Sequence, residues 1–168
     1  MNNNWLLGYL EGQGRFSIVM KKSGPSKRLQ VVADFSVKSD DSELLRDISK
    51  LFGGKIYSKS GAWVLKITKL KDILKVVKFF EGKEMTSKAQ RETFQTWKEC
   101  VKLIENKDHL TNEGMLAIAT LRNNLHFKDK WNKKSFCAVK AEIDPCGMYK
   151  IYGEIPKGCR GCSEGSGR

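Results

Sequence analysis

Alternation of apolar with mostly polar side chains is the feature that most constrains the fold of this chain. Phe16, Ile18 and Met20 alternate with mostly polar neighbours, and residues 29–37 repeat the pattern after the turn SGPS. A period of two is typical of a strand with one buried face, and a polar turn between two such strands predicts a hairpin. We therefore expect a hairpin with one apolar face and one mostly polar face.

A second hairpin is predicted in residues 55–68, with its turn at Ser60 and Gly61. Apolar residues at helical spacing predict helices over 5–12 and 42–52, the latter stopped by Gly53, and three more beginning near residues 70, 88 and 111. The order is helix, two strands, helix, two strands and three helices. This order predicts the α+β class, with a four-stranded antiparallel sheet covered by helices on one face. Trp63 and Trp97 are expected in the core.

The charge of the chain indicates the class of partner. Thirty-one Lys and Arg against nineteen Asp and Glu give a net charge of +12, which favours a polyanion. Antiparallel strands can lie in a DNA major groove, with cations on phosphates and polar groups on base edges. A strand of about eight residues spans ~28 Å, or about eight base pairs. The polar sheet face would present Arg15, Ser17, Lys21, Arg28, Gln30, Ser36, Lys38, Lys55, Tyr57, Lys59 and Lys66.

Other readings are open at this point. A charged sheet face can simply be solvated, and we expect groove binding because of the net charge. An acidic membrane surface would also suit the charge. The sequence has neither an apolar stretch of spanning length nor a signal peptide, so we expect a soluble intracellular protein with no membrane partner. The only histidines are His109 and His126, which excludes a nuclease centre built on several histidines of this chain.

Two glycines interrupt the first predicted helix, in the stretch WLLGYLEGQG. Gly8 and Gly12 lie on one helix face, and each costs up to about 1 kcal/mol relative to Ala, so a packing reason is expected. Missing side chains allow a second backbone to come close. The partner would be the same helix of another copy, or else a neighbouring helix of this chain.

A family resemblance rests on these residues. LLGYLEGQG followed by RFSI resembles the LAGLIDADG motif of homing endonucleases, and residues 86–125, with TSK and HLTNEG, are similar to the later part of those domains. The resemblance covers about residues 4–127 and implies an αββαββα endonuclease-like domain over residues 1–127, with a saddle-like sheet. A single motif implies a homodimer on a pseudo-palindromic duplex DNA site. Its interface would include Leu6, Gly8, Tyr9, Glu11 and Gly12.

The resemblance also implies a cleavage site. It places a divalent metal, Mg²⁺, at the eighth motif position, which is Gln13, with Gly12 beside it. An amide brings no negative charge, so we expect Mg²⁺ to be held weakly or out of place there, which would disable cleavage. Three explanations are open: an engineered knockout, a natural descendant that only binds, or Glu11 as a substitute ligand, although Glu11 points about 200° away on a helix. Lys88 matches the family's catalytic basic residue, and Lys38 or Ser39 stands near its polar residue at the end of the second strand.

The remaining residues, 128–168, form a predicted basic, cysteine-containing extension. Four of the five cysteines lie there, and a loose extension is expected, with a zinc site as the alternative. The four are Cys137, Cys146, Cys159 and Cys162. Two further functions compete with the endonuclease: an RNA-binding intron-splicing maturase and a DNA-binding protein without cleavage. The family suggests a mitochondrion, a chloroplast or a microbial cytoplasm as the location.

Overall fold

A computed structural model describes residues 2–23 and 28–125 of the chain. The predicted element order is confirmed. The elements are α1 Asn3–Gln13, β1 Gly14–Ser23, β2 Arg28–Ser39, α2 Ser42–Phe52, β3 Lys55–Lys59, β4 Ala62–Ile67, α3 Leu70–Phe80, α4 Lys88–Glu105, the 3₁₀ turn η1 Asp108–Leu110 and α5 Asn112–Leu125. The cysteine-containing extension lies outside the described residues, so its zinc site and its boundary stay predictions.

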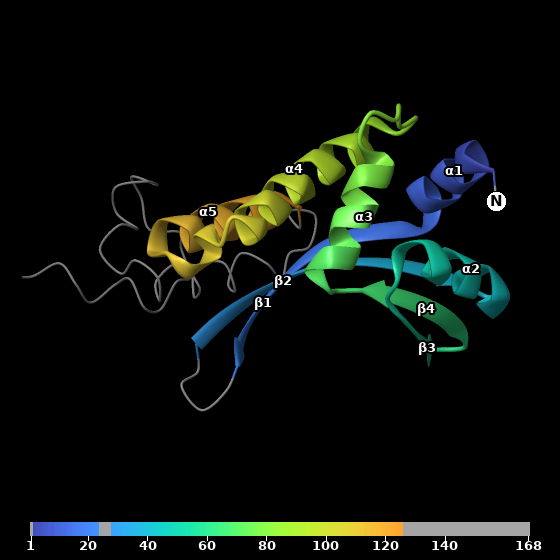
Figure 1. Ribbon diagram of the computed structural model, residues 1–168, viewed down its shortest axis with the longest axis horizontal. Coiled ribbons are helices and arrows are strands. Elements are labelled where there is room, and N and C mark those ends of the chain that lie inside the picture. The colour runs from blue at the N-terminus through green and yellow to red at the C-terminus, as the bar shows by residue number, and fades with distance from the viewer. Residues whose placement is uncertain (1, 24–27, 126–168) are drawn as a thin grey trace, which may run out of the picture.

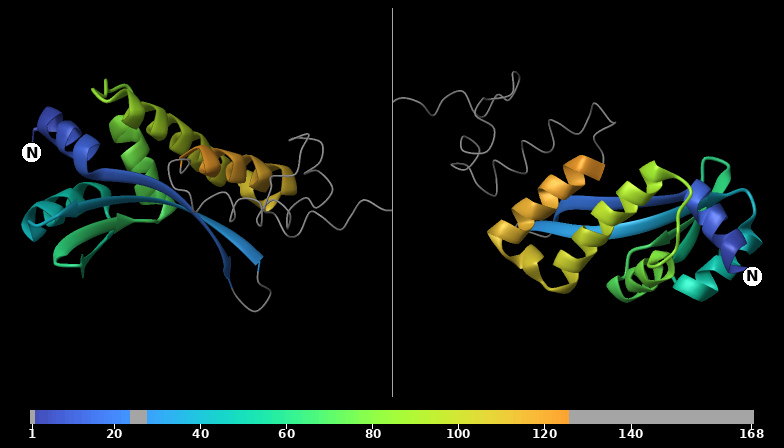
Figure 2. Two further views of the ribbon diagram at one scale, coloured as in Figure 1. Left: turned by 180° about the vertical axis from the view of Figure 1, so that it is seen from behind. Right: turned by 90° about the horizontal axis from the view of Figure 1, so that it is seen from above.

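The four strands form one antiparallel sheet in the order β1-β2-β4-β3. In Figures 1 and 2 the helices lie on one side of this sheet, and the two hairpins bend away from the helical layer. The described elements therefore make two layers, with one sheet face covered and the other uncovered. The α+β class and the one-sided helical layer are as predicted. None of the described helices is long and apolar enough to cross a membrane.

The core lies between the sheet and the helices and is rich in aromatic rings. Phe16 contacts Phe35, Phe80, Phe94 and Trp97, with ring centroids 5.0 to 5.5 Å apart. Aromatic pairs at such distances stabilise a core beyond the burial of their area. The indole nitrogen of Trp97 donates to the carbonyl oxygen of Ser17 at 3.2 Å, which fixes α4 against the edge strand β1.

One core prediction is wrong. Trp97 is fully buried, as expected, but Trp63 is 39% exposed. Its strand neighbours are Ser39 at the end of β2 and Ser58 near the end of β3, so it lies where the sheet runs out. Alternation along β4 gives the correct face for Trp63, but helices do not cover this end of the sheet enough to bury an indole.

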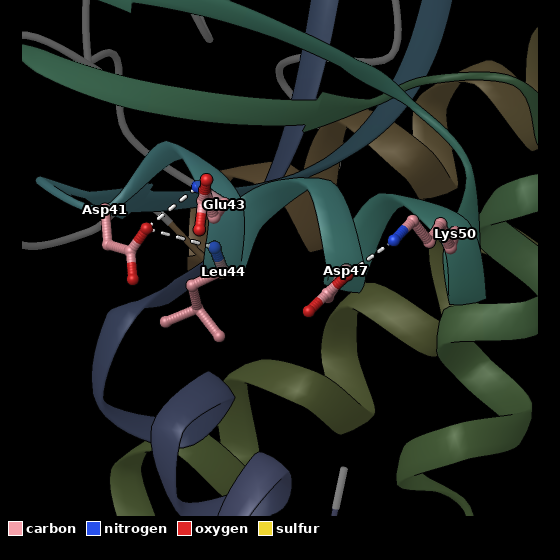
Figure 3. A network of polar contacts seen from close by, with 5 residues as sticks. All are labelled: Asp41, Glu43, Leu44, Asp47 and Lys50. Carbon is pink, nitrogen blue, oxygen red and sulfur yellow. Dashed lines mark hydrogen bonds and ion pairs between the residues drawn. The ribbon is translucent and has the colours of Figure 1, made fainter.

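The helix starts follow from local capping. The side chain of Asn2 accepts the backbone N–H of Asn4 at 2.9 Å at the start of α1. At the start of α2, Asp41 accepts the N–H groups of Glu43 and Leu44, at 2.8 and 3.2 Å (Figure 3). These bonds satisfy N–H groups that have no partner within the helix. The predicted stop at Gly53, where φ is +85°, is confirmed.

The turn before α5 is held by the side-chain hydroxyl of Thr111. Thr111 accepts the N–H of Gly114 at 3.0 Å, so α5 begins one residue after the predicted start. A Cβ on Gly114 would lie 2.0 Å from the carbonyl oxygen of Asp108, so only glycine fits there. His109, in η1 just before this cap, is half-buried.

Candidate nucleic-acid interface and cleavage site

Helix α1 has a buried side and an open side. Leu6 and Leu10 are 1% and 0% exposed and belong to the core, so the side chain of Leu6 is not available to the interface in which the resemblance places it. Gly8 and Gly12 are exposed, and a Cβ built on either would meet no heavy atom within 4 Å. Packing against another described part of this chain therefore does not explain the glycines. The open side leaves room for the backbone of another molecule.

Two further predicted interface residues of α1 make contacts within the chain. Tyr9 stacks on Trp5 with ring centroids 5.3 Å apart, and Trp5 is 50% exposed. The carboxylate of Glu11 accepts the backbone N–H groups of Thr86, at 3.2 Å, and of Ser87. Ser87 is the N-cap of α4, so Glu11 adds a negative charge at the positive end of an 18-residue helix. This contact joins the last turn of α1 to the start of α4.

The predicted catalytic residues lie close in the sequence to the residues that form this junction. Gln13 is the last residue of α1 and is exposed, and Lys88 is the first residue of α4, with a side chain 88% exposed. The contact of Glu11 with Thr86 and Ser87 therefore brings the two helix ends that carry them into one region. At the end of β2, Ser39 accepts the N–H of Asp41 at 3.1 Å, whereas the side chain of Lys38 is exposed.

The residues at this junction fit a divalent metal poorly. Mg²⁺ prefers carboxylate oxygens, and the two predicted ligands offer an amide oxygen from Gln13 and a backbone carbonyl from Gly12, neither of them charged. Both carboxylate oxygens of Glu11 accept backbone N–H groups just before α4, from Thr86 and Ser87, which argues against Glu11 as a substitute ligand. In residues 2–23 and 28–125, no group of three or more His, Cys, Asp or Glu side chains could hold a metal ion.

The uncovered sheet face carries the predicted DNA-facing residues. The strand register puts Arg15, Ser36, Lys66 and Lys55 side by side in one row across all four strands. We call these four residues the central row. Lys38 pairs through Val64 with Tyr57 in a neighbouring row, and Lys21 pairs with Gln30 farther along the first hairpin. Ser17 and Lys59 fall on the same face by alternation, whereas the side chain of Arg28 lies outside the part of the chain that the structure describes.

Sequence reasoning did not single out Asp34, an acid on this same face. Asp34 pairs with Ser17 in the register and is 4% exposed, and its carboxylate lies 2.9 Å from the ammonium of Lys66. Arg15, Lys21, Lys38, Lys55 and Lys59, the other described cations of this face, have no acidic partner among the described residues. A single acid among the polar positions of a basic strand is the sequence feature that marks Asp34. Its pairing with Lys66 depends on the register of β2 and β4, which the sequence does not show.

Taken together, the structure is a two-layer α+β protein with a cationic sheet face and a glycine-containing first helix. The family model described as LAGLIDADG endonuclease matches residues 6–101, and the chain therefore belongs to this family. Two curated Neurospora crassa proteins are similar. Probable intron-encoded endonuclease 2 is 30% identical over 126 residues, covering 73% of this chain and 27% of the relative. Probable intron-encoded endonuclease 3 is 26% identical over 132 residues, covering 74% and 25%. The chain spans about a quarter of the length of these relatives.

Solved structures share the fold. The homing endonuclease I-TnaI gives a TM-score of 0.73 at 22% identity, over 85% of this chain and 98% of that chain. The archaeal intron-encoded I-Vdi141I, complexed with DNA, gives 0.73 at 22% identity, over 85% and 94%. I-SmaMI, bound to uncleaved DNA in the presence of calcium ions, gives 0.70 at 22% identity, over 88% and 49%. Endonucleases of this family use divalent metals.

Proposed function

We propose that this chain binds a specific duplex DNA site through the uncovered face of its sheet, on a homing-endonuclease scaffold whose cleavage step is disabled by Gln13. The observation that carries the proposal is the central row. Three cations and a hydroxyl, from Arg15, Lys66, Lys55 and Ser36, stand in register across the four strands on the face that no described helix covers. Such a row offers donors to phosphates and to base edges at once. DNA complexes among the similar structures and the net charge of +12 support it.

We infer that two copies pair through α1 and read a pseudo-palindromic site. Gly8 and Gly12 support this, because they leave an open strip on α1 that nothing in the described chain fills. Two subunits related by a two-fold axis present the same residues to the two half-sites. The intron-encoded relatives also support an intracellular location, in a mitochondrion, a chloroplast or a microbial cytoplasm.

The loss of cleavage follows from the donor set at the junction of α1 and α4. Phosphodiester hydrolysis needs negatively charged ligands for the Mg²⁺ that the family resemblance implies, and Gln13 supplies none. Gln and Glu are nearly equal in size, so Gln13→Glu restores the charge with little change of shape. Lys88, close to the same junction, would then stabilise the charge that develops on the phosphate.

The experiment begins with selection of bound duplexes from a randomised library by the unmodified chain. Cleavage of the selected duplex is then measured with Mg²⁺ for the unmodified chain, for Gln13→Glu and for Gln13→Asn. We expect all three to bind, and only Gln13→Glu to cut. The Asn variant is the control, because it changes the side chain without adding charge. The double variant Gln13→Glu, Lys88→Met should bind and lose most of the cleavage.

Three results would contradict the proposal. Cleavage by the unmodified chain would show that Gln13 does not disable the cleavage step. Binding without cutting by every variant would show that the cleavage site is assigned wrongly. Preference for structured intron RNA over every selected duplex would favour the maturase instead.

A further inference from the structure

The ion pair between Asp34 and Lys66 is unusual for a face that binds DNA. Asp34 is one of only two buried polar or charged residues in the described chain, yet it lies on the cationic side of the sheet. A carboxylate repels phosphates, and it cancels the charge of the lysine that it holds. The pair therefore adds little to general attraction for DNA, and long-range electrostatics does not explain its place.

The surroundings of Lys66 show what the pair does. Lys66 stands in the central row between Ser36 on one side and Lys55 on the other. Like charges opposite each other on neighbouring strands repel, so a free Lys66 would turn away from Lys55. Asp34, two residues before Ser36 on β2, holds the Lys66 ammonium at 2.9 Å instead. The Lys66 side chain is still 39% exposed, so it is fixed in direction and reachable from outside.

We propose that Lys66, positioned by Asp34, is a base-reading residue that selects guanine. An ammonium offers only donors, and guanine is the base that presents two acceptors, N7 and O6, in the major groove. A lysine held by a carboxylate loses its rotameric freedom before DNA binds, which suits a base contact more than a phosphate contact. Arg15, Lys38 and Lys55 have no acidic partner in the described residues and are left to contact phosphates. This inference rests on the proposed function and assigns to Lys66 the base preference at one position of the DNA site.

The place of the pair in the sheet predicts where the guanine falls. Arg15, at the β1 end of the central row, is the second residue of β1 and so lies close to the end of α1. Lys21 lies six residues farther along the strand. Six residues of strand span ~20 Å, which is about six base pairs. If α1 lies at the two-fold axis, Lys66 reads a position in the inner part of each half-site. Lys21 and Gln30 then lie over the outer part.

The experiment compares base preferences among matched variants of the full chain. Duplexes are selected from a random library by the unmodified chain, Lys66→Met, Lys55→Met, Asp34→Asn and Lys66→Arg, and sequenced. Affinity for the best duplex is measured over a range of salt concentrations. Lys55→Met is the matched control, because it removes the same charge from the next strand of the same row. Circular dichroism confirms that each variant is folded.

We expect Lys66→Met to lose about fivefold to tenfold of its preference for guanine at one inner position of each half-site, with the outer positions unchanged. Asp34→Asn should relax the same position while weakening no other. Lys66→Arg should retain guanine. Lys55→Met should keep every base preference and weaken binding to all duplexes, with a shallower dependence on salt.

Two results would overturn the inference while leaving the proposed function intact. One is a Lys66→Met variant that weakens all duplexes equally, since Lys66 would then be a phosphate contact. The other is an Asp34→Asn variant with unchanged base preference, since the pair would then serve only the stability of the sheet. Selection of no sequence at all by the unmodified chain would overturn the proposed function itself, and this inference with it.

Discussion

Replacing Gly8 and Gly12 by alanine should stabilise the isolated chain and abolish pairing between chains. Alanine in a helix interior is favoured over glycine by about 0.5–1 kcal/mol. A Cβ at either position meets no heavy atom within 4 Å, so no steric cost offsets the gain. Gly12 is the residue before the last of α1, where helices fray, so its gain is near the lower limit. Together the two changes should add about 1–1.5 kcal/mol, or about 4 °C in Tm at this chain length.

The same two methyl groups should act in the opposite direction on the dimer. If two α1 helices approach each other along Gly8 and Gly12, four added methyl groups in the dimer stand where the two backbones meet. The helices must then move apart and lose their contact. We expect sedimentation velocity to show monomers at concentrations at which the unmodified chain is dimeric. Affinity for the two-fold DNA site should fall at least tenfold, because each subunit then binds one half-site alone.

Gly114→Ala is the matched contrast, a glycine-to-alanine change in another helix of the same chain. Its Cβ would lie 2.0 Å from the Asp108 carbonyl oxygen, so we expect a loss of about 1–3 kcal/mol. Thermal unfolding at a concentration where the chain is monomeric measures both changes. The reasoning is refuted if the Gly8, Gly12 double variant is less stable than the unmodified chain under those conditions, or if it pairs equally well.

Two further predictions concern single side chains. Glu11→Ala should lower the free energy of unfolding in urea by about 1–2 kcal/mol, because two backbone N–H groups at the start of α4 lose their acceptor. Glu11→Gln, which keeps one acceptor oxygen, is the control. Equal stability of the unmodified chain and both variants would contradict the contact. Burial raises the pKa of the Cys100 thiol to about 12 from 9.0, so Cys100 should resist alkylation at pH 8 until the chain unfolds, as peptide mapping by mass spectrometry would show. Because the unfolded chain ionises at the lower pKa, the contribution of this thiol to stability should be complete below pH 9 and be lost as the pH rises toward 12.

The sequence predicts those parts of the fold that depend on neighbouring residues. Alternation predicts the two hairpins. Asn2 and Asp41 begin helices through hydrogen bonds to N–H groups two or three residues away, and Gly53 ends a helix through its own positive φ. The uncovered face follows as well, because the side chains of a strand alternate between its faces regardless of which strands are neighbours. The resemblance to the family motif then implies DNA binding for the sheet face and pairing of two copies for the first helix.

Contacts between distant residues could not be predicted in this way. Glu11 and Ser87 are 76 residues apart, and their bond depends on where α4 begins in space. Asp34 meets Lys66 only because β2 pairs with β4 in one register, and a shift by one residue would turn one of them to the other face. The exposure of Trp63 depends on how far the helices extend over the sheet. In each case the deciding factor is a tertiary arrangement that the local pattern leaves free.

A glutamine at position 13, where the family resemblance implies an acid, is compatible with an intact fold because α1 distributes its roles among separate residues. Leu6 and Leu10 fill the core, Glu11 holds α4, and Gly8 and Gly12 form the open strip. Gln13 is exposed at the end of the helix, and its side chain makes no hydrogen bond within the described residues. Exchange of Gln for Glu there should change the free energy of unfolding by no more than about 0.5 kcal/mol. Under the proposed function, DNA binding and pairing of two copies would therefore persist without cleavage, and a single substitution at this position would separate cleavage from binding.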